Sequence, residues 1–212
     1  MIKEFEKRIL SSLILIPIAF FFIIQGSVFF MFFLGLFFLA TSYEWVKMSK
    51  KNNFIKNFGI IFLFFSFYSA FYVREDNGLN IFLFIIIVCI FTDLGGYIFG
   101  KTFKGPKLTK ISPNKTYAGV IGSFLLSLIA GLVFIKYVDD GDIQNINQLT
   151  LFVIILSISL ISQIGDLIIS YFKRKAKLKD TGKILPGHGG LLDRIDGLIF
   201  VVPIIYLLQL IK

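Results

Sequence analysis

Long apolar segments separated by short polar loops make up most of this chain. Segments of about 17–25 apolar residues are long enough to cross a hydrocarbon core of about 30 Å as helices. Because lipid cannot satisfy open backbone groups, segments of this kind must be helical. The pattern predicts seven spans, at residues 9–25, 28–43, 58–73, 81–100, 117–137, 150–172 and 191–211. The predicted fold class is therefore all-α, a polytopic integral membrane helical bundle with about seven transmembrane helices.

The first two predicted spans are separated only by Gly26 and Ser27, which predicts a tight hairpin or a less regular connection. A cleaved signal peptide is not expected, because acidic residues interrupt the basic start and no small-residue cleavage pattern follows. No repeat and no Ser/Pro-rich linker separates a second domain. We expect one continuous membrane domain. Residues 1–80 would supply about three N-terminal spans, and residues 81–212 the candidate catalytic helices and their loops.

Positive charge is concentrated in alternate loops. Of the 22 lysines and arginines, 18 precede the first span or lie in residues 44–57, 101–116 and 173–190, whereas most loop carboxylates lie on the opposite side. By the positive-inside rule, the N-terminus is cytoplasmic and the C-terminus is not. We expect a multi-pass protein of the cell's inner membrane, in contact with membrane lipids. Topology thus explains the net charge of +9, and nucleic acid is not an expected partner.

Four carboxylates remain inside the predicted spans, at Asp93, Asp166, Asp193 and Asp196. Each would cost about 2.5–3.5 kcal/mol or more if it faced lipid at the centre of a helix. All four lie toward the cytoplasmic ends of spans that run in different directions. A common polar cavity explains this better than separate ion pairs with nearby lysines. Carboxylate oxygens without a His/Cys cluster favour Mg²⁺ held partly by substrate phosphates.

Three spans carry residues at helical spacing. In the sixth, a polar stripe that must face protein or water consists of Ser159, Ser162, Gln163, Asp166, Ser170 and Lys173. In the fifth, small residues that favour close helix packing recur at Gly119, Ser123, Ser127 and Gly131. In the seventh, Asp193 and Asp196 are one turn apart, so both could address the same ion or phosphate group.

Two basic loops are candidate phosphate sites. Before the fifth span, Ser112 is the predicted N-cap and Pro113 the first helical residue, with Lys115 beside them. A helix N-terminus with a lysine favours phosphate, although a topogenic lysine with ordinary capping explains the same residues. After the sixth span, the glycines of residues 186–190 would let backbone approach a ligand. His188 in that run is either a substrate contact or a loop histidine bonded to backbone.

Residues 170–196 read SYFKRKAKLKDTGKILPGHGGLLDRID, and this segment resembles the signature of the phosphatidate cytidylyltransferases, the CDP-diacylglycerol synthases. Two upstream stretches are similar to the family as well: residues 92–101, TDLGGYIFGK, and residues 111–119, ISPNKTYAG. Two positions depart from its pattern. Ala118 stands where relatives usually carry an acidic residue, and Ile169 stands where they often have Glu. These departures argue against a role for a third carboxylate in those neighbourhoods and allow a different substrate preference.

The resemblance implies that CTP and phosphatidic acid react to give CDP-diacylglycerol and pyrophosphate, with Mg²⁺ and a possible second cation. The implied catalytic residues are Asp166, Asp193, Lys173 and Arg194. The implied metal ligands are Asp166 and Asp193, supported by Asp93 and Asp196. The implied substrate-binding residues are Ser112, Asn114, Lys115, Thr116, Ser170, Arg174, Lys179, Asp180, His188, Gly189 and Gly190. For a small membrane enzyme of this kind, a homodimer is a plausible assembly.

Three other functions are compatible with parts of the pattern. A CTP-dependent kinase for a lipid alcohol would release CDP instead of pyrophosphate. A CDP-alcohol phosphotransferase is less favoured, because Leu198, Ile199 and Phe200 occupy positions where its acidic motif has small and arginine residues. A transporter also uses buried acids, but it would show paired broken helices in two related halves, and no such halves occur in the sequence.

Overall fold

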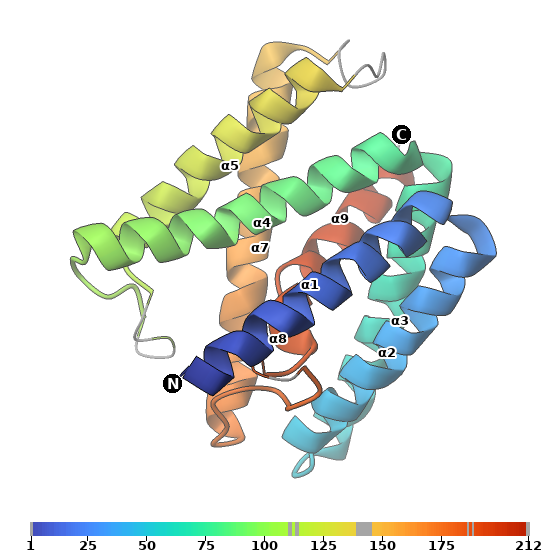
Figure 1. Cartoon of the computed structure of the whole chain (residues 1–212), viewed down its shortest axis with the longest axis vertical. Helices are drawn as coiled ribbons and strands as arrows, with labels where there is room; N and C mark the ends of the chain where they lie inside the picture. Colours follow the sequence, from blue (N-terminus) through green and yellow to red (C-terminus); the bar gives the residue numbers. More distant parts are fainter. Residues whose placement is uncertain are drawn as a thin grey trace.

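Helices form nearly all of the regular structure. The computed structural model describes residues 2–109, 112, 115–138, 146–185, 187 and 189–210, and within these ranges it contains no strand, only two isolated bridges. The helices are α1 (Ile2–Gln25), α2 (Ser27–Met48), α3 (Asn53–Asp76), α4 (Gly78–Phe103), α5 (Tyr117–Tyr137), α7 (Gln148–Lys175), α8 (Leu192–Ile195) and α9 (Leu198–Leu210) (Figure 1). The predicted all-α class is confirmed.

Five of these helices, α2, α3, α4, α5 and α7, are long and apolar enough to cross a membrane, so the chain is a multi-pass membrane protein. At the two ends, the apolar helical segments Leu13–Gln25 and Leu198–Leu210 are shorter than the prediction. The prediction of one helix over residues 191–211 is wrong, because the chain turns between α8 and α9. There the Asp196 carboxylate accepts the N–H of Gly197 at 3.0 Å, a local bond that competes with continued helix.

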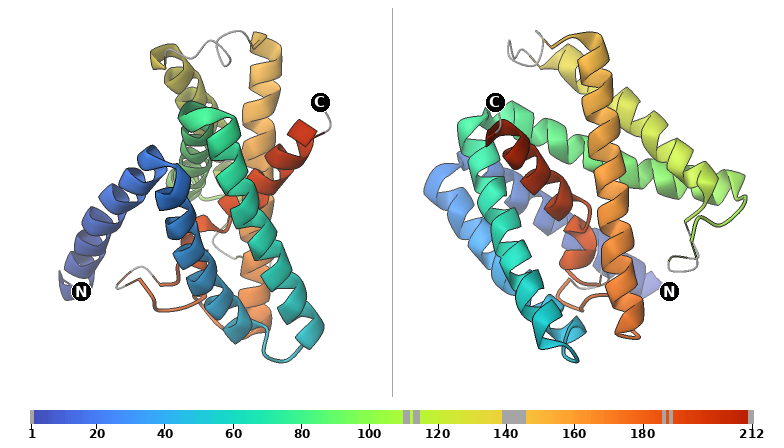
Figure 2. Two further views of the ribbon diagram at one scale, coloured as in Figure 1. Left: turned by 90° about the vertical axis from the view of Figure 1, so that its right-hand side faces the viewer. Right: turned by 180° about the vertical axis from the view of Figure 1, so that it is seen from behind.

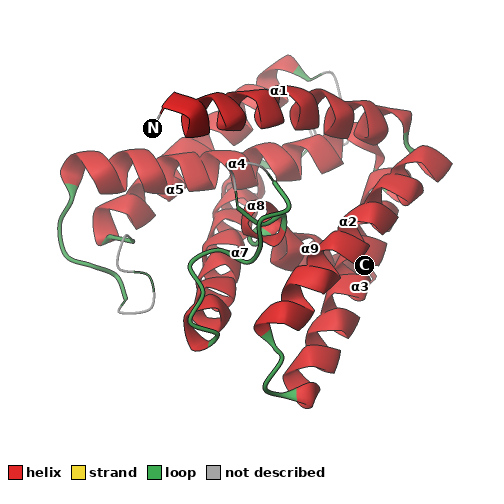
Figure 3. Ribbon diagram, turned by 60° about the horizontal axis from the view of Figure 1, so that its bottom comes forward, coloured by secondary structure: helices red, strands yellow, loops and turns green. Residues whose placement is uncertain are grey.

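The loops divide between two sides of the molecule. The N-terminus, the α2–α3 turn, the α4–α5 connection and the α7–α8 loop lie on one side, and the C-terminus and the α1–α2 and α3–α4 turns lie on the other (Figures 1 and 2). We call the first the basic side, because its loops hold the lysine-rich segments of the sequence. Figure 3, in which this side comes forward, shows the α7–α8 loop lying over its centre.

The α1–α2 connection is a tight turn at Gly26, whose φ of 65° favours glycine. Two residues at the end of α3 hold this turn. Arg74 donates to two carbonyls at the end of α1 at 2.9 and 2.8 Å, and Glu75 accepts the N–H of Ser27 at 2.8 Å. Groups left open by the ends of α1 and α2 are thereby satisfied, and the tight hairpin is the form that the chain adopts.

Helices α4 and α5 form the closest helix pair, and they meet through small residues. All four residues of the predicted small-residue stripe on α5 are buried. A side chain at Gly95 of α4 would collide with the backbone of Gly122 of α5, and the Ser123 hydroxyl donates to the carbonyl of Thr92 at 2.7 Å. The stripe therefore packs one helix against another, as predicted.

Large apolar side chains fill the rest of the bundle in two clusters. One lies among α2, α3, α4, α7 and α9 and includes Phe30, Phe82, Ile85, Val88, Ile155 and Val201. The other lies nearer the basic side and consists of Trp45, Met48, Leu63, Ile169, Leu192 and Ile199. Ile169, one of the two departures from the family pattern, is thus a core residue that faces apolar neighbours.

Candidate active site

A polar cavity of about 400 Å³ lies among α4, α5, α7 and the α8 turn. All four intramembrane carboxylates line it, so the prediction of a common polar cavity is confirmed. Ten of the predicted site residues form part of its wall: Asp93, Ser112, Lys115, Thr116, Asp166, Lys173, Asp180, Asp193, Arg194 and Asp196. The predicted stripe on α7 faces the same way, because Gln163, Asp166 and Lys173 also lie on this wall.

Asp166 is held by groups from two elements. Its Oδ2 atom is 2.6 Å from the Nζ atom of Lys115, which precedes α5, and its Oδ1 atom accepts the hydroxyl of Ser170 at 3.2 Å. Lys115 also donates to the carbonyl of Gln163 at 3.3 Å. One lysine thus joins the start of α5 to α7 across the cavity.

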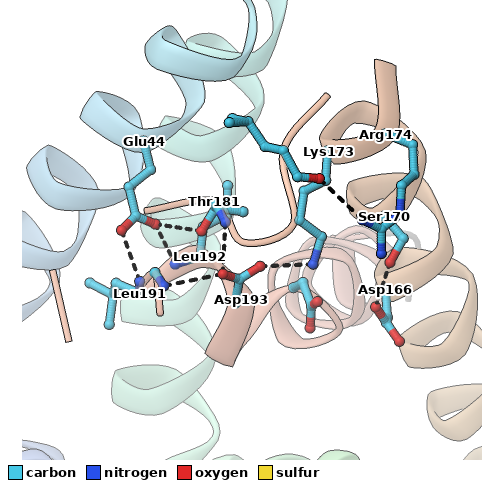
Figure 4. A network of polar contacts seen from close by, with 12 residues as sticks. Glu44, Asp166, Ser170, Lys173, Arg174, Thr181, Leu191, Leu192 and Asp193 are labelled. Carbon is cyan, nitrogen blue, oxygen red and sulfur yellow. Dashed lines mark hydrogen bonds and ion pairs between the residues drawn. The ribbon is translucent and has the colours of Figure 1, made fainter. Parts of the chain in front are cut away.

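Asp193 is held from three directions, as Figure 4 shows. Its Oδ1 atom is 2.8 Å from Nζ of Lys173, and the two side chains are only 9% and 11% exposed. Its Oδ2 atom accepts the N–H groups of Thr181 at 2.8 Å and Gly190 at 3.1 Å. A buried ion pair is tolerated when further hydrogen bonds satisfy its remaining atoms, and the α7–α8 loop supplies them.

Asp196 and Asp93 complete the acidic wall. Asp196 is 7% exposed and lines the same cavity wall as Asp166. The wall brings five carboxylates, including Asp180, together with three basic side chains, Lys115, Lys173 and Arg194. With all groups ionised, acidic charge exceeds basic charge. An anionic ligand would therefore enter this cavity most readily with a cation.

The start of α5 differs from the prediction, because Thr116 is the N-cap and Ser112 is not. The Thr116 hydroxyl accepts the N–H of Gly119 at 3.1 Å, and the helix begins at Tyr117. Thr116 itself has an extended backbone, and Leu108 donates to the carbonyl of Lys115 at 2.8 Å beside an isolated bridge between Lys107 and Thr116. That pairing prevents an earlier helix start. Lys115 therefore precedes the helix and reaches into the cavity.

A third anchored carboxylate, Glu44 of α2, was not predicted from the sequence. It is 1% exposed and accepts the Thr181 hydroxyl at 2.9 Å, the Leu191 N–H at 3.0 Å and the Leu192 N–H at 2.9 Å (Figure 4). In the sequence it is one acidic residue at the edge of a lysine-rich loop, where positive charge dominates the pattern. The available signal was a lone carboxylate at the end of an apolar span.

Comparison with known proteins gives the family. Residues 56–211 match the model described as "Cytidylyltransferase family". The chain belongs to this family. A phosphatidate cytidylyltransferase of Rickettsia typhi is 38% identical over 204 residues, which cover 94% of this chain and 89% of that protein.

Two staphylococcal relatives share the same name. Phosphatidate cytidylyltransferases of Staphylococcus haemolyticus and Staphylococcus aureus are each 43% identical, over 65% and 71% of this chain. The matches cover 52% and 54% of those two proteins, so the chain spans about half the length of the staphylococcal relatives. The family match begins at residue 56, so it does not include Glu44.

The other site residues expected of a cytidylyltransferase lie off the cavity wall or outside the described residues. Ser170 supports Asp166, the exposed Arg174 donates to the carbonyl of Leu178 at 3.2 Å, and Lys179 is exposed. Asn114 and His188 lie outside the described residues.

The expected approach of Gly189 and Gly190 to a ligand stays a prediction, and the structure shows a packing role for both. Gly189 has a φ of 87° and its carbonyl accepts the N–H of Leu185 at 3.0 Å, which closes a turn. A side chain at Gly190 would collide with Thr181 and Glu44. These two cytidylyltransferase glycines therefore allow loop segments to pack against each other and against α2, and neither lines the cavity.

The donor chemistry of the cavity suits Mg²⁺ in part. Among the described residues, no three carboxylate, imidazole or thiol groups are placed to hold one metal ion by themselves. Mg²⁺ usually takes one or two carboxylates and completes its shell with water and substrate phosphates. The carboxylates of Asp166 and Asp196, which line the same cavity, suit such a shared site, whereas Asp193 is already engaged by Lys173 and two backbone amides.

Proposed function

We propose that this protein is a phosphatidate cytidylyltransferase, which makes CDP-diacylglycerol and pyrophosphate from CTP and phosphatidic acid at the cytoplasmic face of the inner membrane. The observation that carries the proposal is the polar cavity itself, with its facing carboxylates and basic side chains at the basic side of the molecule. Membership of the cytidylyltransferase family and the names of the relatives support the substrate pair.

The proposed reaction needs no protein nucleophile. An oxygen of the phosphatidic acid phosphate attacks the α-phosphorus of CTP, the bond from this phosphorus to the bridging oxygen of the β-phosphate breaks, and pyrophosphate leaves with the electron pair. Because the attacking oxygen is already anionic, catalysis can rest on positioning and on neutralising phosphate charge. Lys115, Lys173 and Arg194 are the cavity cations available for both tasks.

Mg²⁺ is the proposed cofactor, with Asp166 and Asp193 as its ligands and Asp93 and Asp196 in support. When bound, it would neutralise phosphate charge that the three basic residues leave unbalanced. For Asp193 to serve as a ligand, Lys173 would transfer from its carboxylate to a substrate phosphate. The 2.8 Å ion pair between them keeps both groups in the cavity until then.

The lipid substrate would enter from the side. Tyr97 and Val120 lie on the cavity wall, and Tyr97 is 65% exposed on the outer surface of α4. The phosphate of a two-tailed lipid could therefore reach the acids and lysines while its acyl chains stay beside α4 and α5. CTP would enter from the basic side, where the loops meet water.

Purified protein in detergent, given Mg²⁺ and CTP labelled in the cytidine or in the γ-phosphate, tests the proposal. With phosphatidic acid we expect cytidine label in lipid and the γ-phosphate label in pyrophosphate. Transfer of the γ-phosphate to a lipid alcohol, with CDP released, would instead identify a kinase. No label in lipid under varied divalent metals would overturn the proposal. In the same assay, Asp166→Asn should lower turnover about 100-fold or more, and near-normal turnover would refute the metal assignment.

A further inference from the structure

Glu44 is the most deeply buried carboxylate among the described residues, and the proposed reaction does not explain its role. Its side chain is 1% exposed at the end of α2, and among the described residues no lysine or arginine forms an ion pair with it. A buried charge is costly unless its hydrogen bonds are satisfied. Here the partners are two backbone N–H groups and one hydroxyl, all from the α7–α8 loop and the start of α8.

The contacts require both carboxylate oxygens. Oε1 accepts the N–H of Leu191, while Oε2 accepts the N–H of Leu192 and the hydroxyl of Thr181. These two N–H groups lie at the start of α8, and the N-cap residue of α8 makes no side-chain capping bond. A carboxylate suits this position because hydrogen bonds to a charged acceptor are the stronger kind. An amide would turn an NH₂ group toward at least one of these N–H donors.

The loop is shaped around this carboxylate. A side chain at Gly182 would collide with the Glu44 carboxylate, and one at Gly190 would collide with both Glu44 and the Thr181 hydroxyl. Two glycines of the signature segment thus leave space that Glu44 occupies. Since Glu44 comes from α2, the loop is closed against an element that lies outside the family match.

The same loop residues hold Asp193. Thr181 donates its hydroxyl to Glu44 and its N–H to Asp193, and the neighbouring amides of Gly190 and Leu191 bind Asp193 and Glu44 respectively (Figure 4). Any movement of this backbone away from Glu44 would also move the two amides that orient Asp193. The position of the Asp193 carboxylate therefore depends on the Glu44 carboxylate.

We propose that Glu44 is a positioning residue for Asp193, which fastens the α7–α8 loop to α2 so that two loop amides orient the Asp193 carboxylate in the cavity. The inference rests on the proposed function only for what Asp193 then does. Glu44 does not line the cavity, so its effect on the reaction would pass through Asp193.

Three variants and one control test this role. Glu44→Gln loses an acceptor, Thr181→Val loses the hydroxyl with little change in shape, and Thr181→Ser keeps it. The control is Thr41→Val, because Thr41 is fully buried on α2 but its hydroxyl bonds only carbonyls of its own helix. We expect Glu44→Gln and Thr181→Val to lower kcat about 10- to 100-fold and to raise the Mg²⁺ concentration needed for half-maximal rate. Thr181→Ser should stay near wild type, and Thr41→Val should keep its full kcat.

If Glu44 only supported the fold, the variants would have lower thermal stability and a lower yield of folded protein. The kcat and the Mg²⁺ requirement of the folded enzyme would not change. That result for Glu44→Gln and Thr181→Val would overturn the proposal. If Glu44→Gln does not fold, Thr181→Val decides the question alone. The double variant with Glu44→Gln and Thr181→Val should have a kcat no lower than that of Glu44→Gln alone, since both changes act on the same contact between Thr181 and Glu44.

Limited trypsin digestion separates this inference from the proposed function. The α7–α8 loop holds exposed lysines at positions 177, 179 and 183. Cleavage there should be several-fold faster in Glu44→Gln than in Thr41→Val, whatever the enzyme's activity. If wild-type protein makes no CDP-diacylglycerol, the proposed function fails while digestion still tests the loop. Equal cleavage rates in the two variants would refute the fastening of the loop by Glu44.

Discussion

Lys173 and Asp193 form the best-sheltered ion pair in the described part of the chain, at 2.8 Å. Lys173 lies in the last turn of α7 and Asp193 in the four-residue α8, so the pair joins two elements at the basic side. The net stabilisation from such a pair is small, because desolvation offsets most of the attraction. Removing one partner is different, since it leaves a buried charge without its counterion.

We therefore expect Lys173→Met and Asp193→Asn each to lower the free energy of unfolding by about 3–5 kcal/mol, and the double variant to lose less than the sum. Chemical unfolding in detergent measures this, with CDP-diacylglycerol synthesis assayed in parallel. All three variants should have little activity, including the double variant that recovers stability. Additive losses of stability would show that the two side chains are not coupled.

At the residue scale, the sequence predicted which groups would meet but not what would hold them. Asp93, Asp166, Asp193 and Asp196 were found because a charge inside an apolar span is unusual in any context. Several of their partners, Lys115 and the amides of Thr181 and Gly190, come from loops, whose paths depend on pairing far along the chain. Glu44 was missed for this reason, because its three donors lie 137 or more residues away in sequence.

Among the elements, α9 shows how an interrupted helix is accommodated in a membrane bundle. Pro203 lies inside α9 and has no N–H, so the carbonyl of Ile199 one turn earlier lacks its helical partner. The Ser66 hydroxyl of α3 lies 2.8 Å from that carbonyl and can donate to it. An open carbonyl in a lipid environment is costly, so this bond stabilises the packing of α3 against α9.

Replacing Ser66 by alanine should lower the free energy of unfolding by about 1–2 kcal/mol, because the Ile199 carbonyl loses its donor. Ser69→Ala is the matched control. Ser69 is equally buried and lies one turn further along α3, but its hydroxyl donates only to Phe65 of its own helix, at 2.8 Å. Thermal unfolding of both variants in one detergent gives the comparison. Equal shifts would mean that the bond between α3 and α9 adds nothing.

At the element scale, helix positions followed from apolar length alone, and helix ends did not. The predicted span 117–137 matches α5 residue for residue, because Thr116 and Tyr137 lie at changes of polarity. The last predicted span was wrong for a local reason, since Asp196 binds the neighbouring N–H and α9 starts afresh after Gly197. A carboxylate within an apolar run thus marked a break in the helix as well as a candidate site.

For the whole molecule, the lysine distribution and the position of the cavity together bear on which side of the membrane the cavity faces. The lysine-rich loops gather on one side of the molecule (Figures 1 and 2). Asp93 and Asp166 lie in the C-terminal halves of α4 and α7, and both helices end on that side. If the positive-inside rule holds for this chain, the cavity opens to the compartment that contains CTP. With the opposite orientation, the same cavity would face a compartment without nucleotide, so orientation is decisive for the proposed function.

Single-cysteine labelling tests the orientation directly. The native Cys89 is buried in α4, so a membrane-impermeant maleimide should leave the unaltered protein unlabelled and provide the background. Lys50→Cys in the α2–α3 turn and Lys183→Cys in the α7–α8 loop should react only after cells are permeabilised. Tyr137→Cys, at a position 79% exposed at the far end of α5, should react in intact cells. The reverse pattern would place the cavity on the outer side and exclude CTP as its substrate, because nucleotide and lipid phosphate must meet at the same face of the membrane.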